Sequence, residues 1–259
     1  MIYTCYEMIR DCRAGRPEGW TYFLTQYVPA IGKLLAHYFP DRAGDALTET
    51  VVTALHGDAS LFQSLDPAPE RAFVSELRQA VLRVAGAGAG ATEASLDLET
   101  LTAAFEPLTL TEKLTVWFET MCYANEDAAR MLRMSPQTAE KIRTRGPDLL
   151  RANLDHWSAG LLASNGLALG RAATALAAKD CLPAKTFFDV IDGRATWRGR
   201  EDMERHVRTC WHCLDHYCRL LEVVDLLRGA APLNAADIER YQRLLGIEVR
   251  KRRFWQRAT

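Results

Sequence analysis

The chain has 259 residues, of which 48% are hydrophobic and 25% are charged, and its formal net charge is −1. These values are ordinary for a soluble globular protein of one large or two to three small domains. No apolar run approaches the roughly 20 residues that span a bilayer, and Glu7 and Asp11 stand where a signal peptide would be apolar. The sequence therefore excludes a membrane-spanning protein, and we expect a cytoplasmic one.

Charge is unevenly distributed along the chain. Residues 1–100 carry five more acidic than basic residues, whereas residues 130–151 and 230–259 each carry four more basic than acidic ones. Such basic stretches can contact nucleic acid, although solvated helix faces are equally common. In a reducing compartment, the seven cysteines are better explained by a metal site with additional free thiols than by a disulfide framework.

Helix signals dominate the sequence, and they predict an all-α fold. In residues 1–84 the apolar side chains recur every three or four positions, which is typical of amphipathic helices. Pro17 is well placed to begin the second helix, Asp41 or Asp45 can cap the third, and Asp66 with the following proline can begin a fourth. The side chains predicted to face the core are Trp20, Phe23, Leu24, Tyr27, Ile31, Leu34, Leu35, Leu47, Val51, Val52, Leu55, Phe73, Leu77, Ala80, Val81 and Val84.

The next segment predicts a linker followed by two helices joined by a short turn. Residues 85–105 open with AGAGAGA, which cannot bury enough surface to be held in place, and we expect a linker there. Thr109 and Glu112 have the spacing of a capping box, and Ser135 is placed to cap the helix that carries the basic residues. Gly146 and the proline after it are expected to interrupt that helix. A helix-turn-helix and an ordinary helical hairpin with a basic outer face fit this spacing equally well.

The remaining segments also predict helices. Residues 153–180 are rich in Ala and Leu and predict a helical connector, interrupted near Gly166 and Gly170. Asn234 can cap a last helix within residues 230–259, and this helix is followed by a tail of basic and aromatic residues. Such a tail suits phosphate contact and stacking, although solvated charge at a terminus explains it as well.

One spacing in the sequence is typical of a metal site. Cys181, His206, Cys210 and Cys213 form the pattern C-x24-H-x3-C-x2-C, whose three thiolates and one imidazole are a full tetrahedral set for Zn²⁺. On one helix the last three would lie at i, i+4 and i+7 on a single face, with Cys181 arriving from a separate element. Each cysteine taken alone would be an ordinary buried residue, but four residues of metal-ligand type in this order favour a metal site.

Three parts of the chain resemble bacterial transcription regulators. Residues 17–84, with Trp20-x2-Phe23-x3-Tyr27 and DRAGDALTETVVTAL, resemble region 2 of an extracytoplasmic-function sigma factor. Residues 106–151 resemble its region 4, through EPLTLTEKLTVWF and NEDAARMLRMSPQTAEKIRTRGPDLLR. The Cys followed by His-x3-Cys-x2-Cys in residues 181–229 is similar to the hallmark of zinc-binding anti-sigma domains. The resemblance implies helical bundles: domains at 1–84, 106–152 and 181–229, with 85–105 and 153–180 between them and a C-terminal helix and tail at 230–259.

The resemblance also implies ligands and partners. It implies Zn²⁺ on Cys181, His206, Cys210 and Cys213, core RNA polymerase and promoter DNA as partners, and an intramolecular contact between the sigma-like and anti-sigma-like modules. The helix that begins after Ser135 would face a promoter −35 element. Gln and Arg can bond to base edges, and Lys and Arg can bond to phosphates. The candidate DNA-binding residues are Gln137, Thr138, Lys141, Arg143 and Arg145.

The sequence is consistent with two functions from different classes. The first is a transcription regulator in which the tethered zinc module holds the sigma-like module inactive, with the zinc either a redox switch or purely structural. The second is a scaffold protein built on a sigma-like fold, because LRVAGAGAGA stands where sigma factors carry the segment that opens DNA. We do not expect an enzyme, since HExxH, a phosphate loop and G-x-S-x-G are missing and four protein ligands leave zinc no open position.

Overall fold

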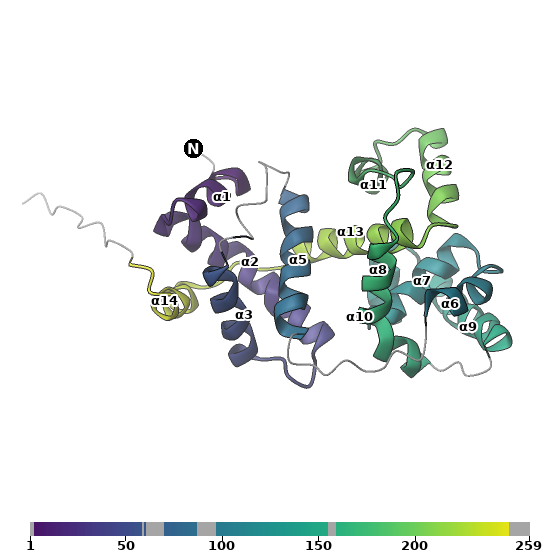
Figure 1. Cartoon of the computed structure of the whole chain (residues 1–259), viewed down its shortest axis with the longest axis horizontal. Coiled ribbons are helices and arrows are strands. Elements are labelled where there is room, and N and C mark those ends of the chain that lie inside the picture. Colours follow the sequence, from purple (N-terminus) through teal and green to yellow (C-terminus); the bar gives the residue numbers. More distant parts are fainter. Residues whose placement is uncertain (1–2, 59, 61–69, 87–96, 155–158, 249–259) are drawn as a thin grey trace, which may run out of the picture. The chain divides into compact units, whose positions relative to one another are not determined.

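The computed structural model describes residues 3–58, 60, 70–86, 97–154 and 159–248, and these residues form helices and no strands (Figure 1). The all-α prediction is therefore confirmed for the described part of the chain. The helices are α1 (Cys5–Arg13), α2 (Pro17–Tyr38), α3 (Asp45–Gly57), α5 (Glu70–Gly86), α6 (Leu98–Phe105), α7 (Leu110–Thr120), α8 (Asn125–Met131), α9 (Pro136–Asn153), α10 (Ala159–Ala175), α11 (Ala184–Ile191), α12 (Trp197–Val207), α13 (Trp211–Gly229) and α14 (Ala235–Leu244).

The chain divides into two compact units, which we describe separately. Unit 1 contains residues 1–88 together with residues 226–259, and unit 2 contains residues 89–225. The C-terminal segment thus folds with the N-terminal helices. Unit 2 contains residues 106–152, the Ala-rich connector and most of residues 181–229, which the sequence predicts to be two domains with a connector between them.

Unit 1 is built around α2. Thr4 and Glu7 form a capping box at the start of α1, and Pro17 occupies the first turn of α2, as its fixed φ angle favours. The predicted apolar stripe is buried: Phe23, Tyr27 and Phe73 meet in edge-to-face and tilted ring contacts. Such side chains, each fully removed from water, supply the main stabilisation of a helical bundle.

Unit 2 is built around α7, which packs against α8, α9 and α10. The capping box predicted for Thr109 and Glu112 is present at its start. Trp117 and Phe118 are fully buried. Helix α10 approaches so closely that a Cβ atom on Gly166 would lie 1.6 Å from the carbonyl oxygen of Thr120. A glycine at this position is what allows the two backbones to touch.

Three local predictions differ from the structure. Helix α6 occupies residues 98–105, which we had assigned to a linker, because Leu101 and Phe105 are buried in unit 2. Helix α9 continues through Pro147 to Asn153 and is not interrupted there, since Gly146 and Leu150 on either side are buried and hold it in place. Helix α10 likewise passes through both of its internal glycines. Packing outweighs local helix propensity in each case.

The sequence also predicted where two helices of unit 1 begin. The N-cap of α3 is Gly44, with Asp45 as the first helical residue and neither aspartate bonding as a cap. The start predicted at Asp66 lies outside the described residues. Within the described ranges, no helix combines the length and the apolar character that crossing a bilayer requires.

Candidate metal centre and helix-turn-helix

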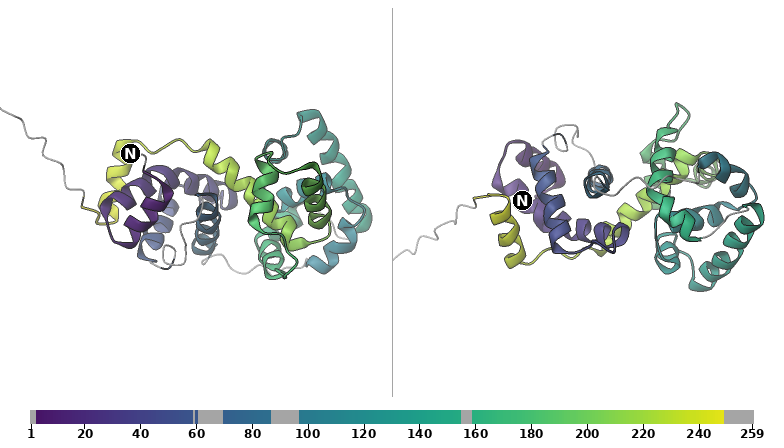
Figure 2. Two further views of the ribbon diagram at one scale, coloured as in Figure 1. Left: turned by 90° about the horizontal axis from the view of Figure 1, so that it is seen from above. Right: turned by 60° about the horizontal axis from the view of Figure 1, so that its bottom comes forward.

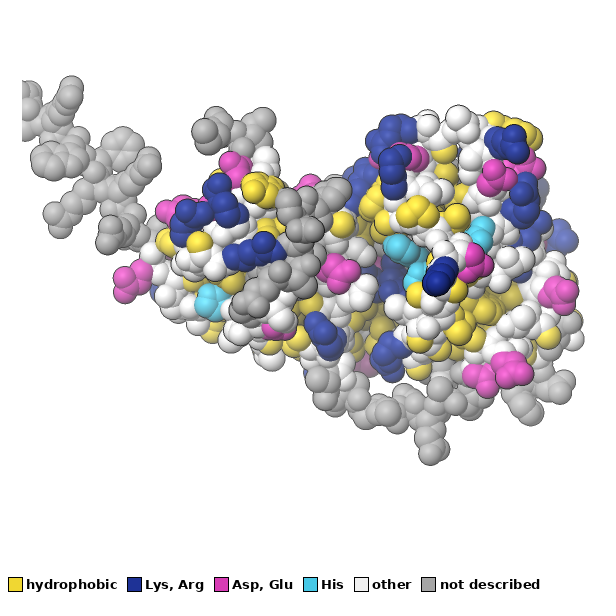
Figure 3. Space-filling model, turned by 45° about the horizontal axis from the view of Figure 1, so that its top comes forward, with side chains coloured by type: hydrophobic (Ala, Val, Ile, Leu, Met, Phe, Trp, Pro, Cys, Tyr) yellow, Lys and Arg dark blue, Asp and Glu magenta, His cyan; other side chains and the backbone are white. Residues whose placement is uncertain are grey.

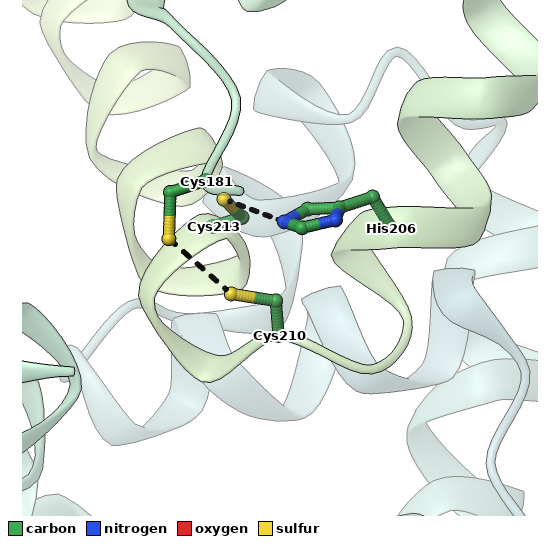
Figure 4. Close-up of side chains that lie close together, drawn as sticks. All are labelled: Cys181, His206, Cys210 and Cys213. Atoms are coloured by element: carbon green, nitrogen blue, oxygen red, sulfur yellow. Dashed lines mark hydrogen bonds between the residues drawn. The ribbon is translucent and has the colours of Figure 1, made fainter. Parts of the chain in front are cut away.

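The structure brings the four predicted metal ligands together (Figure 4). Cys181 lies in the segment before α11, His206 in the last turn of α12, Cys210 between α12 and α13, and Cys213 in the first turn of α13. Their ligand atoms all lie within 4.8 Å of one another. The Sγ atoms of Cys181 and Cys210 are 3.8 Å apart, and His206 Nε2 lies 3.2 Å from Cys213 Sγ. Together they could hold a metal ion.

The prediction that His206, Cys210 and Cys213 share one helix face is wrong. Helix α12 ends after Val207, and the backbone N–H groups of Thr209 and Cys210 both bond to the carbonyl of His206 at 3.1 Å. The carbonyl of Cys210 then accepts the N–H of Leu214, which starts α13. On a straight helix the three donors would lie in a row along the axis, whereas this corner gathers them around one point.

One pair of sulfur donors has the spacing found in a tetrahedral zinc site. With Zn–S bonds of about 2.3 Å, two sulfurs of a tetrahedron lie about 3.8 Å apart, which matches Cys181 and Cys210. Backbone N–H groups point at two of the sulfurs: Ala178 donates to Cys181 at 3.3 Å, and Leu182 donates to Cys213 at 3.4 Å. Such bonds from backbone N–H groups orient the sulfur atoms that would contact a metal ion.

Without a cation the thiolate form is costly at the most buried ligand. Burial raises the pKa of the Cys213 thiol to about 12, the N–H of Leu182 lowers it, and Cys210 and Cys181 raise it further. A divalent cation would supply the positive charge that this crowded set of sulfurs needs. Four protein donors fill a tetrahedral shell, so the arrangement suits structural metal binding rather than the activation of water.

A small apolar core supports the four ligands. Phe187 of α11 is fully buried, and its ring stacks on Tyr217 of α13 at 5.6 Å and contacts His216 at 5.3 Å. Met203 and Val207 of α12 are also buried. Basic and acidic side chains are interleaved at the upper right of the surface in Figure 3. Helices α11 and α12 carry ion pairs of this kind, Lys185 with Asp189 and Arg200 with Glu204. A core of this size gains much of its stability from a metal.

The corner between His206 and Cys213 is attached to α7. Lys113 of α7 is buried, and its Nζ donates to the carbonyl of Arg208 at 2.9 Å. Burial lowers the pKa of Lys113, as does the charge of Arg208, while Glu106 raises it. Residues 206–213, which we call the metal corner, therefore contact α7 through this bond.

Trp211 makes the second attachment. Its indole Nε1 donates to Thr102 Oγ1 at 3.0 Å, and its ring lies 4.9 Å from that of Phe105 and 5.3 Å from that of Trp117. These three partners belong to α6 and α7. A side chain placed between two metal ligands thus completes the core of the neighbouring helices.

Helix α13 continues this contact along α7 and α8. Trp117 Nε1 donates to Asp215 at 3.2 Å, and the hydroxyl of Tyr123 donates to Glu222. Arg130 of α8 forms a bidentate pair with Asp225 at 3.0 and 2.8 Å. Asp215 and Glu222 are both buried, and buried carboxylates are stabilised by such bonds. The partners advance in the same direction on both segments, so α13 lies alongside them.

Helices α8 and α9 are joined by a short turn, an arrangement shared by a DNA-binding helix-turn-helix and an ordinary helical hairpin, and Ser135 accepts the N–H of Thr138 as N-cap of α9. Of the candidate DNA-binding residues, Gln137, Thr138, Lys141 and Arg145 are exposed on α9. Arg145 Nε lies 3.3 Å from Glu112, the capping residue of α7. The side chain of Arg143 lies outside the described part of the chain. The buried face of α9 is turned towards α7 through Ala139 and Gly146.

Sequence reasoning missed the residues that attach the metal corner. Lys113 was not singled out because an isolated lysine in a helix is most often solvated. Trp211 carried a weak signal, since a tryptophan between two ligand cysteines must pack somewhere. His212 and His216 lie outside the four-residue cluster: His212 Nδ1 lies 3.2 Å from the carbonyl oxygen of Thr174, and the ring of His216 contacts that of Phe187.

No family model matches this sequence, and no curated protein or solved structure is significantly similar to it. Its function has to be inferred from the cysteine and histidine cluster, the helix-turn-helix and the contacts between them.

Proposed function

We propose that the chain is a transcription regulator in which a sigma factor-like part is joined to a zinc-binding, anti-sigma-like part that restrains it. The single observation that carries the proposal is the placement of the four-donor cluster on a corner whose residues pack against α6 and α7, the helices that precede α8 and α9. In this proposal the module that binds metal acts on its neighbour through a contact within the same chain. A tether makes such a contact effective even where the intrinsic affinity is weak.

The proposed metal is Zn²⁺. Three sulfur donors and one imidazole nitrogen form the soft, four-coordinate set that zinc prefers, whereas calcium and magnesium require oxygen donors. Zinc here would hold α11, α12 and the start of α13 around one point. Loss of the thiolates by oxidation would release the metal, and this offers a route for regulation.

DNA reading is assigned to the outer face of α9. Gln137, Thr138 and Lys141 are exposed near its N-terminus, which is the part of a recognition helix that reaches base edges. Arg145 is also exposed, and its bond to Glu112 holds it one turn further along. Of these side chains, Gln137 and Arg145 can bond to base edges, and Lys141 and Arg145 can bond to phosphates.

A scaffold role without promoter opening is the alternative, and one observation favours it. Among the basic residues of α5, Arg78 is buried, donates to the hydroxyl of Tyr38 at 2.6 Å and lies over that ring. It is therefore committed to the core of unit 1, and only Arg83 near the end of α5 is exposed. Capture of single-stranded DNA needs more positive charge and aromatic stacking partners.

Two binding measurements on the full chain decide between these functions. We expect the regulator to retain core RNA polymerase in a pull-down and to shift promoter-like duplex DNA, with stronger binding after the zinc has been removed by chelation. Matched measurements on Cys210→Ser should resemble the chelated protein. Failure of both the pull-down and the shift, with and without zinc, would leave the scaffold function.

A further inference from the structure

Helix α14 lies in unit 1 beside α2 and α3, far in the sequence from both (Figure 2). The segment leading to it runs along α2: the carbonyl of Gly229 accepts Lys33 Nζ, and the N–H of Leu233 donates to the carbonyl of Thr25 at 3.1 Å. Asn234 then caps α14 by accepting the N–H of Asp237 at 2.9 Å. The C-terminal segment is thus positioned on unit 1 before α14 begins.

The contact of α14 itself has one apolar anchor and a charged edge. Tyr241 is 2% exposed and is the buried residue of this helix. Next to it, Arg240 lies 2.8 Å from Asp45 and 3.6 Å from Glu49, both on α3. Gln242 donates to Thr21 of α2 at 2.9 Å. Aromatic and arginine side chains of this kind dominate the energy of helix docking.

Helix α14 depends on this face for its own structure. A helix of ten residues is shorter than the roughly 12 to 15 that are marginal in water. Its ion pairs are partly exposed, with Asp45 78% accessible, and exposed pairs contribute little. Leu244 at its end is 45% exposed and adds little burial. A short helix held by one buried ring is displaceable, and its tether is what keeps it at high local concentration.

We propose that the α2–α3 face of unit 1 is a helix-docking surface and that residues 229–244 of the same chain are its occupant. Another protein can reach this face only after α14 has left. The recognised chemistry is a helix that presents one aromatic ring next to an arginine. The docking uses none of the four candidate metal ligands, so its test does not depend on a bound metal.

A peptide added in trans tests this directly. A fluorescent peptide of residues 231–246 is titrated into the full chain and into a full chain carrying Arg240→Asp and Tyr241→Ala, which release α14. We expect at least tenfold tighter binding to the released chain, because in the wild type the tethered helix competes. Arg243→Asp is the matched control: Arg243 bonds to the carbonyl of Glu239 in its own helix, and this variant should still exclude the peptide.

A charge reversal covers the case in which the released chain fails to fold. Asp45 is an exposed side chain, so Asp45→Arg does not disturb the core of unit 1. A peptide carrying Arg240→Glu should bind the Asp45→Arg chain several-fold more tightly than it binds the wild type. Equal binding of the first peptide to wild-type and released chains, binding to neither, or no preference in the charge reversal would each overturn the proposal.

Discussion

Replacing Trp211 by alanine should destabilise α6 and α7 although Trp211 belongs to neither helix. The substitution removes the indole bond to Thr102 and the ring contacts with Phe105 and Trp117. A hydrogen bond contributes about 1 kcal/mol at most when it is exposed, as this one is, and each aromatic pair contributes about 0.5 to 1.5 kcal/mol. Because Trp211 is half-buried, we expect a loss of about 2 to 3 kcal/mol, below the roughly 3 to 5 for a fully buried Trp.

The assay is native-state hydrogen exchange of the α7 amides, which reports the free energy of opening of unit 2 even if the two units unfold separately. Trp197→Ala is the matched control, since Trp197 is 80% exposed at the start of α12. It should change this free energy by less than about 0.5 kcal/mol. Equal effects of the two substitutions on α7 would refute the attachment of the metal corner to α6 and α7.

Three further predictions concern other parts of the chain. Gly166→Ala should lower the stability of unit 2 by more than about 3 kcal/mol, because the added Cβ would overlap the carbonyl group of Thr120. Gly170→Ala on the same helix is the control, since its Cβ would lie 3.6 Å from Asp215 Oδ1, and it should be neutral or stabilising in thermal melts. Burial lowers the pKa of His56, so the unfolded chain binds a proton at this histidine more tightly than the folded chain does. The free energy of unfolding of unit 1 should therefore fall as pH drops from about 7 through the folded-state pKa. Denaturant titrations at several pH values should show a flatter pH dependence for His56→Gln. Lys141→Ala should weaken DNA binding and lower the salt slope by about 1, with the exposed Lys185→Ala as an unchanged control in shift assays.

Where local rules decide the outcome, the sequence was sufficient. Thr109 and Glu112 predicted a capping box, Ser135 predicted an N-cap, and the aromatic spacing of α2 predicted a buried stripe; all three are present. Each depends on residues within four positions of one another, so no knowledge of distant packing is needed. The four residues that could hold a metal ion were found differently, from the type and order of their donors over residues 181–213.

Where distant segments decide the outcome, the sequence was insufficient. The break between α12 and α13 is specified by where Lys113 and Trp211 find partners about 100 residues away. Pro147 remains inside α9 because Gly146 and Leu150 pack on either side of it. The docking of α14 on unit 1 depends on Arg240 meeting acidic residues of α3, a pairing that no local pattern indicates. Tertiary contacts of this kind override propensity.

The most direct test of the account is the zinc content of the purified full chain, measured by elemental analysis beside Cys210→Ser and Cys122→Ser. Cys122 is an exposed cysteine outside the cluster and provides the matched control. The account predicts about one zinc per chain in the wild type and in Cys122→Ser, and its loss in Cys210→Ser. A wild-type chain without zinc, or a Cys210→Ser chain that retains it in full, would contradict the assignment of this cluster as the metal centre.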